Sequence, residues 1–468
     1  MFIVFREVRY VAEHHPSAGW ATGARWSRRA VLLTGLALAG CSHPRPTIQG
    51  EADDTAGQPH TQALQAILDR RSAALQHKDE KAWLADLDPA DDKLIQQQKM
   101  IFANLRQFTF SNFRYVTEHA FGRQEGDGSY TVFPVVQVTQ LPADAGPGGV
   151  APAESFRYRI ASKDNKLVVT EILPVTQANV EDLGVDTPLA NAPWNTTPLK
   201  VIRAGDVWLA GDDSVPDLDH YASAAQSQVQ KIEAMWGKRL RFPGYVLFFT
   251  KSKDNFATWY EFGKATNFST DVEGIQLPLT GVRTNGQLYD NQYAGSRIVV
   301  NLTSTTVGGD TPELVMRHEL THAVTSRATA VSMGGFAGVL SAPTWAVEGF
   351  ARWMETLEFD SSKSSVRAVV ANAVAKGGFK GKLPATDSFF KGDASLNYAF
   401  GATAFEYVDR TKGRDAAVEF YAQVVDHNDL ESTPFTESSA FQDICQHVMG
   451  VSSATFLQQW AGFVRRGV

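Results

Sequence analysis

Two histidines and a glutamate in one short segment have the residue types and the spacing of a metal site. The segment reads His318-Glu319-Leu320-Thr321-His322. In a helix of 3.6 residues per turn, positions four apart differ by only about 40° around the axis, so both imidazoles would project from one face. Glu319 would lie about 100° from His318, where its carboxylate reaches a water on the metal rather than the metal itself. The segment therefore predicts two metal ligands, His318 and His322, with Glu319 as a general base.

The residues around this segment predict the helix that it needs. Asp310 or Thr311 can cap the first turn, and Pro312 suits a position inside it. Apolar residues then recur around much of the helix circumference, which predicts a largely buried helix. These residues are Leu314, Val315, Met316, Leu320 and Val324.

A third ligand has to come from elsewhere in the chain, because a catalytic zinc ion takes three protein ligands and an exchangeable water. Glu348 is the best candidate, in a segment that begins with the helix-initiating Pro343. An apolar stripe would let this second helix pack on the first: Ala346, Phe350, Trp353, Met354 and Leu357. We therefore expect one Zn²⁺ per chain. The alternatives are purely structural histidines and a solvated helix position for Glu348.

The pattern His-Glu-x-x-His followed by Trp-x-x-Glu-Gly-Phe-Ala resembles the gluzincin metallopeptidases, the peptidase MA-like group that includes thermolysin and aminopeptidase N. The resemblance covers residues 311–354. It implies that His318, His322 and Glu348 bind zinc and that Glu319 takes a proton from the water that attacks a carbonyl.

The same resemblance implies roles for two further segments. A helix from Asn397 would carry Tyr398, whose phenol would donate a hydrogen bond to the tetrahedral oxyanion, unless the ring is only packed in a helix interface. The strand expected at 296–302 would correspond to the edge strand that holds an extended peptide by backbone pairing. An ordinary core strand is the alternative.

Two departures from the gluzincin pattern limit what it implies. No Gly-x-Met-Glu-Asn motif precedes the metal-binding segment, so the amine-binding glutamate of the aminopeptidases has no counterpart. Arg352 occupies the position at which thermolysin-like enzymes place an aspartate that orients a histidine ligand. The residue that would orient the histidines is therefore unassigned.

The first 41 residues have the pattern of a bacterial export signal. Two arginines precede an apolar run at 30–39 that is too short to span a bilayer as a mature helix. The run ends in Leu-Ala-Gly-Cys, which resembles a lipobox and implies that Cys41 carries a lipid. An ordinary signal with a chance cysteine is the alternative, and both Sec and twin-arginine export stay open. We expect a lipoprotein anchored in the membrane of a bacterial cell envelope, facing the extracytoplasmic side.

The rest of the chain predicts an α+β protein in two parts. A flexible tether is expected at 42–59, and a small α+β module at 60–185, with helices followed by an antiparallel meander. This order resembles nuclear-transport-factor-like or cystatin-like modules. A linker at 186–198 would lead into a zinc metallopeptidase domain at 199–468, with a mainly helical active-site half.

Charge and cysteine content exclude some classes of protein. The chain of 468 residues has a net charge of −7, and the first 40 residues carry +3, so the remainder carries −7 − 3 = −10. An acidic body argues against a nucleic-acid partner. The two cysteines, Cys41 and Cys445, provide no disulfide framework once the first is acylated.

These observations together predict a membrane-tethered zinc peptidase that acts on a peptide or protein substrate. Two alternatives remain. One is a non-catalytic envelope binding or scaffold lipoprotein that retains a structural metal site. The other is a zinc amidase that acts on cell-wall material.

Overall fold

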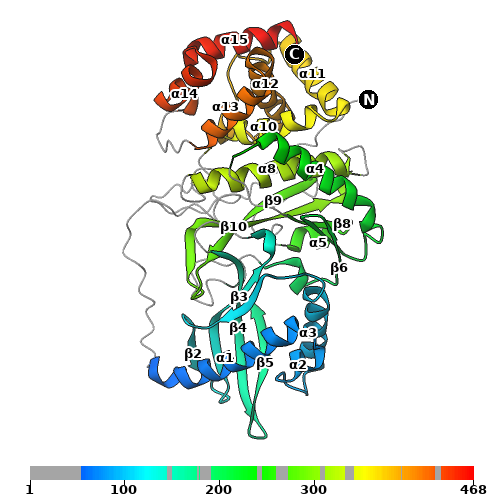
Figure 1. Ribbon diagram of the computed structural model, residues 1–468, viewed down its shortest axis with the longest axis vertical. Helices are drawn as coiled ribbons and strands as arrows, with labels where there is room; N and C mark the ends of the chain where they lie inside the picture. Colours follow the sequence, from blue (N-terminus) through cyan, green and yellow to red (C-terminus); the bar gives the residue numbers. More distant parts are fainter. Residues whose placement is uncertain are drawn as a thin grey trace, which may run out of the picture.

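The computed structural model describes residues 54–144, 150–175, 179, 191–239, 245–259, 272–305, 311–332, 342–391, 393–426 and 434–468 (Figure 1). The expected export signal, with Cys41, lies outside the described residues, as does most of the expected tether. None of the helices in the described part of the chain combines the length and the hydropathy that crossing a bilayer requires.

The first module consists of helices followed by an antiparallel meander, as the sequence predicts. Its elements are α1 (Asp54–Gln76), α2 (Glu80–Leu84), α3 (Asp92–Leu105), β1 (Asn112–Val116), β2 (Phe121–Gln124), β3 (Tyr130–Gln140), β4 (Ala151–Lys163) and β5 (Lys166–Pro174). The side chains of Asp79 and Asp91 accept backbone hydrogen bonds at the starts of α2 and α3, so each helix begins at its own cap. Helix α1 begins at Asp54, so its first six residues fall within the expected tether at 42–59.

The second module begins with strands that extend the same sheet. These are β6 (Lys200–Ala204), β7 (Val207–Gly211), β8 (Tyr245–Thr250), β9 (Gly274–Val282) and β10 (Leu288–Asn301), with helices α4 (Ala222–Trp236), α5 (Lys253–Thr258) and α7 (Leu302–Thr305) between or after them. The strand order is β1-β3-β4-β9-β10-β8-β7-β6, with β2 on β3 and β5 on β4. Because β4 pairs with β9 at Ala151 and Pro152, the two modules share one ten-stranded sheet.

The expectation of an edge strand at 296–302 is wrong. This segment belongs to β10, which pairs in parallel with β8 on one side and antiparallel with β9 on the other. Val299 and Val300 are fully buried, as expected of a core strand. The physical reason is β9, an additional strand that pairs along β10 on the side away from β8.

Helices follow the strands of the second module. In Figure 1 the first of them lies along the sheet, and the others gather at the top of the view. These helices are α8 (Pro312–Ser332), α10 (Thr344–Thr356), α11 (Asp360–Ala375), α12 (Ala394–Lys412), α13 (Arg414–Asp426), α14 (Ser439–Ile444) and α15 (Ser453–Arg466). Short 3-10 helices occur at Pro142–Asp144, Pro193–Asn195, Leu218–Tyr221, Thr386–Ser388 and Phe435–Glu437, and a π-helical turn at Cys445–Met449. The mainly helical half that the sequence predicts is therefore present.

The sheet buries its two faces in different cores because side chains alternate along each strand. On β8, Tyr245, Leu247 and Phe249 join the helix-side core, which continues into α8, α10, α12 and α13. Val246 and Phe248 point the other way, into the module-side core, which contains side chains of the first module such as Phe108. The first module thus covers the face of the sheet that the helices leave open.

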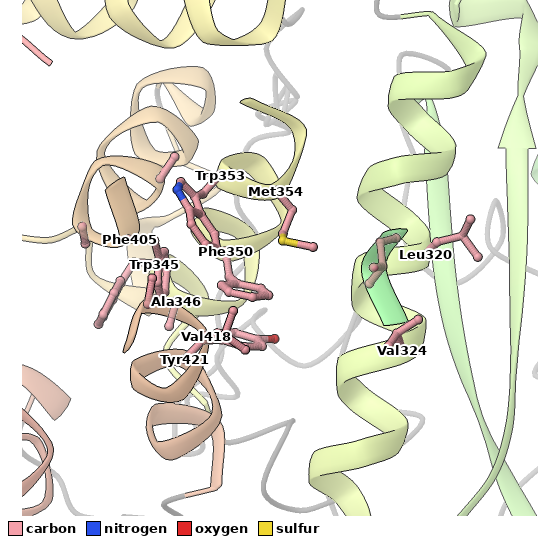
Figure 2. Packing of buried hydrophobic residues seen from close by; sticks show 14 of the residues in the cluster. Leu320, Val324, Trp345, Ala346, Phe350, Trp353, Met354, Phe405, Val418 and Tyr421 are labelled. Carbon is pink, nitrogen blue, oxygen red and sulfur yellow. The ribbon is translucent and has the colours of Figure 1, made fainter. Parts of the chain in front are cut away.

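Aromatic side chains form the helix-side core around α10 (Figure 2). The rings of Phe350 and Tyr421 stack with centroids 3.8 Å apart and an interplanar angle of 3°. Phe405 of α12 packs against Phe350 at 5.3 Å and against Trp353 at 6.2 Å. These contacts fix α10 against α12 and α13.

The expected linker contributes side chains to the module-side core. Trp194, within the expected 186–198 segment, is only 1% exposed, and its ring lies 5.2 Å from Phe108 and 5.8 Å from Phe248. The carboxylate of Glu154 on β4 accepts hydrogen bonds from the backbone N–H of Ala192 (2.9 Å) and from side chains of Trp194 (3.3 Å) and Asn195 (2.9 Å). The segment is therefore tied to both modules, and the domain boundaries at 185 and 199 stay predictions.

We predict that a chain starting at Leu199 does not fold cooperatively. Without the first module, four large side chains of the module-side core would face water: Trp208, Val246, Phe248 and Val299. Exposing four such side chains costs about 6–12 kcal/mol, which is comparable with the whole stability of a typical domain. Thermal unfolding followed by circular dichroism tests this, with a chain starting at Asp54 as the control. A cooperative transition at the control's temperature would contradict the prediction.

We predict that Glu154 makes the protein less stable as the pH rises from about 4.5 to 7. Burial raises the pKa of Glu154 from its usual 4.5 to about 7, against the opposing effect of its hydrogen-bond donors. The folded state therefore binds this proton more tightly than the unfolded state. The stabilisation is complete below pH 4.5 and is lost as the pH passes 7, a change of about 3 kcal/mol.

Denaturant unfolding of the wild type and of Glu154→Gln at pH 4.5 and pH 8 measures this contribution. The difference in unfolding free energy between the two proteins should fall by about 3 kcal/mol between these pH values, because glutamine does not titrate. A difference that is independent of pH would show that the folded protein does not shift this pKa.

Candidate metal centre

Helix α8 and helix α10 bring together the three side chains that the sequence predicts as zinc ligands. His318 Nε2 and His322 Nε2 lie 3.1 Å apart, and Glu348 Oε2 lies 3.2 Å from the first and 3.4 Å from the second. The Thr311 hydroxyl accepts a hydrogen bond from the Leu314 backbone at the start of α8, so Thr311 is a cap of this helix as expected. Asp310 lies outside the described residues.

The separations of these donor atoms fit a zinc ion. Around a tetrahedral zinc with bonds of about 2.0–2.1 Å, neighbouring ligand atoms lie about 3.3 Å apart. The three side chains are 14%, 11% and 17% exposed, so the centre is screened from bulk water without being sealed. Two imidazoles and one carboxylate are also a donor set that zinc prefers.

The electrostatic environment of the cluster favours a cation. Burial disfavours a charge on His318, but its hydrogen bonds to Glu348 and Glu355 outweigh this and raise its pKa well above the usual value. Burial likewise opposes ionisation of Glu348, yet His322 and His318 lower the pKa of that carboxyl far below its usual value. The cluster thus stabilises an ionised Glu348 next to a positive charge, a place that a divalent cation would take.

Glu319 lies beside the donor cluster, against strand β9. Its residue is 8% exposed, and its carboxylate accepts a hydrogen bond from the backbone N–H of Gln276. A Cβ at Gly274 would lie 3.0 Å from Glu319 Cγ and 2.6 Å from Val315 Cγ1, so only glycine lets β9 come this close to α8. Burial raises the pKa of Glu319, which is the direction that a general base near neutral pH needs.

Tyr398 reaches the same cluster from α12. Its ring centroid lies 5.9 Å from that of His318, and its hydroxyl donates a hydrogen bond to Glu348. Burial, together with the charges of Glu348 and Glu319, holds the pKa of Tyr398 well above its usual value. The phenol therefore remains protonated and can act as a donor.

Glu355 is a member of the site that the sequence reasoning missed. Its Oε1 lies 2.6 Å from His318 Nδ1, the imidazole nitrogen that faces away from the donor cluster. Burial opposes its ionisation, but Arg352 and the hydrogen bonds from His318 and Ser362 outweigh this and lower its pKa. Seven residues separate Glu355 from Glu348, which places both on one face of α10. That spacing is a signal that was present in the sequence.

A close contact between two glycines sets the distance between α10 and α12. A Cβ at Gly401 would lie 2.5 Å from the Trp345 carbonyl oxygen and 2.9 Å from Gly349 Cα. Backbone atoms cannot move aside as a flexible side chain can. Because Glu348 precedes Gly349 and Tyr398 lies one turn before Gly401, this contact also sets the distance between Glu348 and Tyr398.

We predict that Gly401→Ala destabilises the protein by about 1–3 kcal/mol and weakens zinc binding, because α10 has to move away from α12. Urea unfolding and zinc titration measure the two effects. Gly462→Ala on α15 is the matched control, since its Cβ would meet only the end of the Arg466 side chain, at 3.2 Å. This control should be neutral or stabilising by up to about 1 kcal/mol. Equal behaviour of the two variants would show that the helix contact is not tight.

Comparison with known proteins finds matches among solved structures. No family model matches the chain, and no curated protein does. The M1 zinc metallopeptidase from Deinococcus radiodurans is 14% identical, with a TM-score of 0.33, over 64% of this chain and 58% of that chain. A point mutant of this enzyme is 15% identical, with a TM-score of 0.33, over 69% of this chain and 62% of that chain. A two-domain M1 zinc metallopeptidase mutant bound to L-tryptophan is 14% identical, with a TM-score of 0.32, over 69% of this chain and 62% of that chain.

The structural neighbours are thus M1 zinc metallopeptidases, and the chain spans about six tenths of their length. At these TM-scores the likeness carries no argument about the activity of this chain. The functional interpretation therefore depends on the arrangement of His318, His322, Glu348 and Glu319 itself.

Proposed function

We propose that the chain is a zinc-dependent peptidase in which His318, His322 and Glu348 hold one zinc ion. The proposal depends on one observation. Three donor atoms from two different helices lie 3.1–3.4 Å from one another, and the buried carboxylate of Glu319 lies beside them. A purely structural metal site has no use for that carboxylate. Glu319 therefore favours catalysis over the scaffold alternative.

The residues of the site divide the reaction between them. A zinc ion held here would supply Lewis acidity, which lowers the pKa of water to near 7. Glu319 takes the proton of the attacking water and returns it to the leaving amine. Tyr398 would turn its O–H from Glu348 to the oxyanion of the tetrahedral intermediate, in a site of low dielectric where such a bond is strong.

Strand β9 supports a peptide as the substrate. In the described part of the chain it pairs with β10 along one side, and with β4 only at Gly281 and Val282 on the other. The rest of its outer edge runs beside Glu319, where Gln276 already turns a backbone N–H toward the site. An extended peptide can pair with such an edge through its own backbone. The sequence resemblance implied this role for the strand at 296–302, which is paired on both sides.

The place of action is also a proposal. We propose that a lipid on Cys41 holds the peptidase at the extracytoplasmic side of a bacterial membrane. The support is the arginine-led apolar run and the Leu-Ala-Gly-Cys ending, both in the sequence.

We predict that Glu319→Gln retains zinc and loses about 10²–10⁴-fold in turnover, because glutamine cannot accept the proton. His318→Ala should lose zinc, because two ligands remain of three. Mass spectrometry of bound metal and chelator-sensitive cleavage of a random peptide library measure these effects. Glu313→Gln, in the first turn of the same helix, is the matched control and should behave as the wild type.

Each result bears on a different alternative. Wild-type turnover by Glu319→Gln would refute the general base. Zinc binding without cleavage of any peptide would support the scaffold protein, whereas cleavage of cell-wall amides but not of peptides would support the amidase.

A further inference from the structure

The side chain of Glu355 is held at both of its oxygens. Oε1 lies 2.6 Å from His318 Nδ1. Oε2 accepts hydrogen bonds from Arg352 Nη1 and from Ser362 Oγ, the latter at 3.0 Å. A carboxylate fixed in this way cannot rotate away from the imidazole. Three helices meet in the arrangement: α8 through His318, α10 through Arg352 and Glu355, and α11 through Ser362.

All of these groups behind His318 lie inside the protein. Arg352 is 3% exposed, and Glu355 and Ser362 are each 1% exposed. Water therefore does not compete for their hydrogen bonds, and the low local dielectric strengthens the contacts. A surface ion pair would exert no such control over its neighbours.

We propose that Arg352 is a positioning residue that acts through Glu355 to aim His318 Nε2 at zinc. This inference rests on the proposed function, since it concerns the affinity of the same metal site. Arg352 pairs with Glu355, and Glu355 in turn contacts His318 Nδ1. Its effect on the metal therefore passes through the Glu355 carboxylate.

Stability alone does not explain why an arginine is placed here. A buried ion pair generally gains little over apolar side chains of the same volume, because both charges lose their hydration. Fixing the Nδ1 side of a metal-binding imidazole has a definite benefit, since it sets the tautomer and the ring orientation. Arg352 lies three residues before Glu355 on α10, where it holds the carboxylate that contacts His318.

Zinc affinity of the full chain tests the proposal. Arg352→Met should raise the Kd for Zn²⁺, measured by competition with a chelator, by about tenfold or more. Arg352→Lys should recover most of this loss, because an ammonium can also donate a charged hydrogen bond to Glu355. Ser362→Ala should shift the Kd in the same direction by less. With Co²⁺ in the site, the visible absorption of Arg352→Met should differ from that of the wild type.

The control is a buried ion pair of the same kind elsewhere. Arg297 donates to both oxygens of Asp144 at 2.9 Å and is 1% exposed, in the sheet rather than in the site. Arg297→Met should lower stability and leave the Kd for Zn²⁺ unchanged. At saturating Zn²⁺, Arg352→Met should lower kcat with KM unchanged, since the arginine lies away from the substrate.

Several results would overturn the proposal. A wild-type Kd in Arg352→Met would do so, as would equal losses in Arg352→Met and Arg297→Met, or no recovery in Arg352→Lys. If Arg352→Met does not fold, an unchanged Kd in Ser362→Ala, in which the Glu355 carboxylate has lost the hydrogen bond from Ser362, would overturn it equally. Absence of zinc binding in the wild type would instead refute the proposed function.

Discussion

A carboxylate on α10 has to reach two imidazoles on α8, and much of the second module is arranged around that approach. On one side of α10, Phe350 stacks on Tyr421 and packs against Phe405, which holds the helix in position. At the neighbouring position on α10, Gly349 contacts Gly401 of α12 with no room for a methyl group. The aromatic rings fill the space beside α10, whereas the two glycines, which lack side chains, let the backbones of α10 and α12 come into contact. A helix placed one ångström further away would leave Glu348 short of the histidines.

The sheet gives these helices a fixed base, because both of its faces are buried. Alternate side chains of β8 enter the helix-side core and the module-side core, so neither face can change its packing independently of the strand. The first module therefore supports the site through the shared sheet. Its role as a support follows from Trp208 and Phe248, which need the first module to cover them.

The sequence predicts those parts of the structure that depend on local spacing. His318 and His322 are four residues apart, and the Trp-x-x-Glu-Gly pattern marks Glu348, so the donor atoms follow from helix geometry and a known pattern. Strand β9 could not be recognised in this way, because its contribution is a backbone edge and a glycine, and its position depends on pairing with β10. Glu355 carried a signal in its seven-residue spacing from Glu348, but its partner His318 comes from another helix. Local sequence patterns do not predict which helices and strands contact one another.

The balance of charge explains why the proposed centre suits a divalent ion rather than a network of hydrogen bonds. Three glutamates lie close together: Glu319, Glu348 and Glu355. Arg352 pairs with Glu355, so that carboxylate is compensated from behind and serves to hold His318. Glu319 and Glu348 remain next to two imidazoles, which are neutral when they act as ligands. Two buried negative charges are costly unless a cation joins them, and a single ion of charge +2 placed between the donor atoms removes that cost.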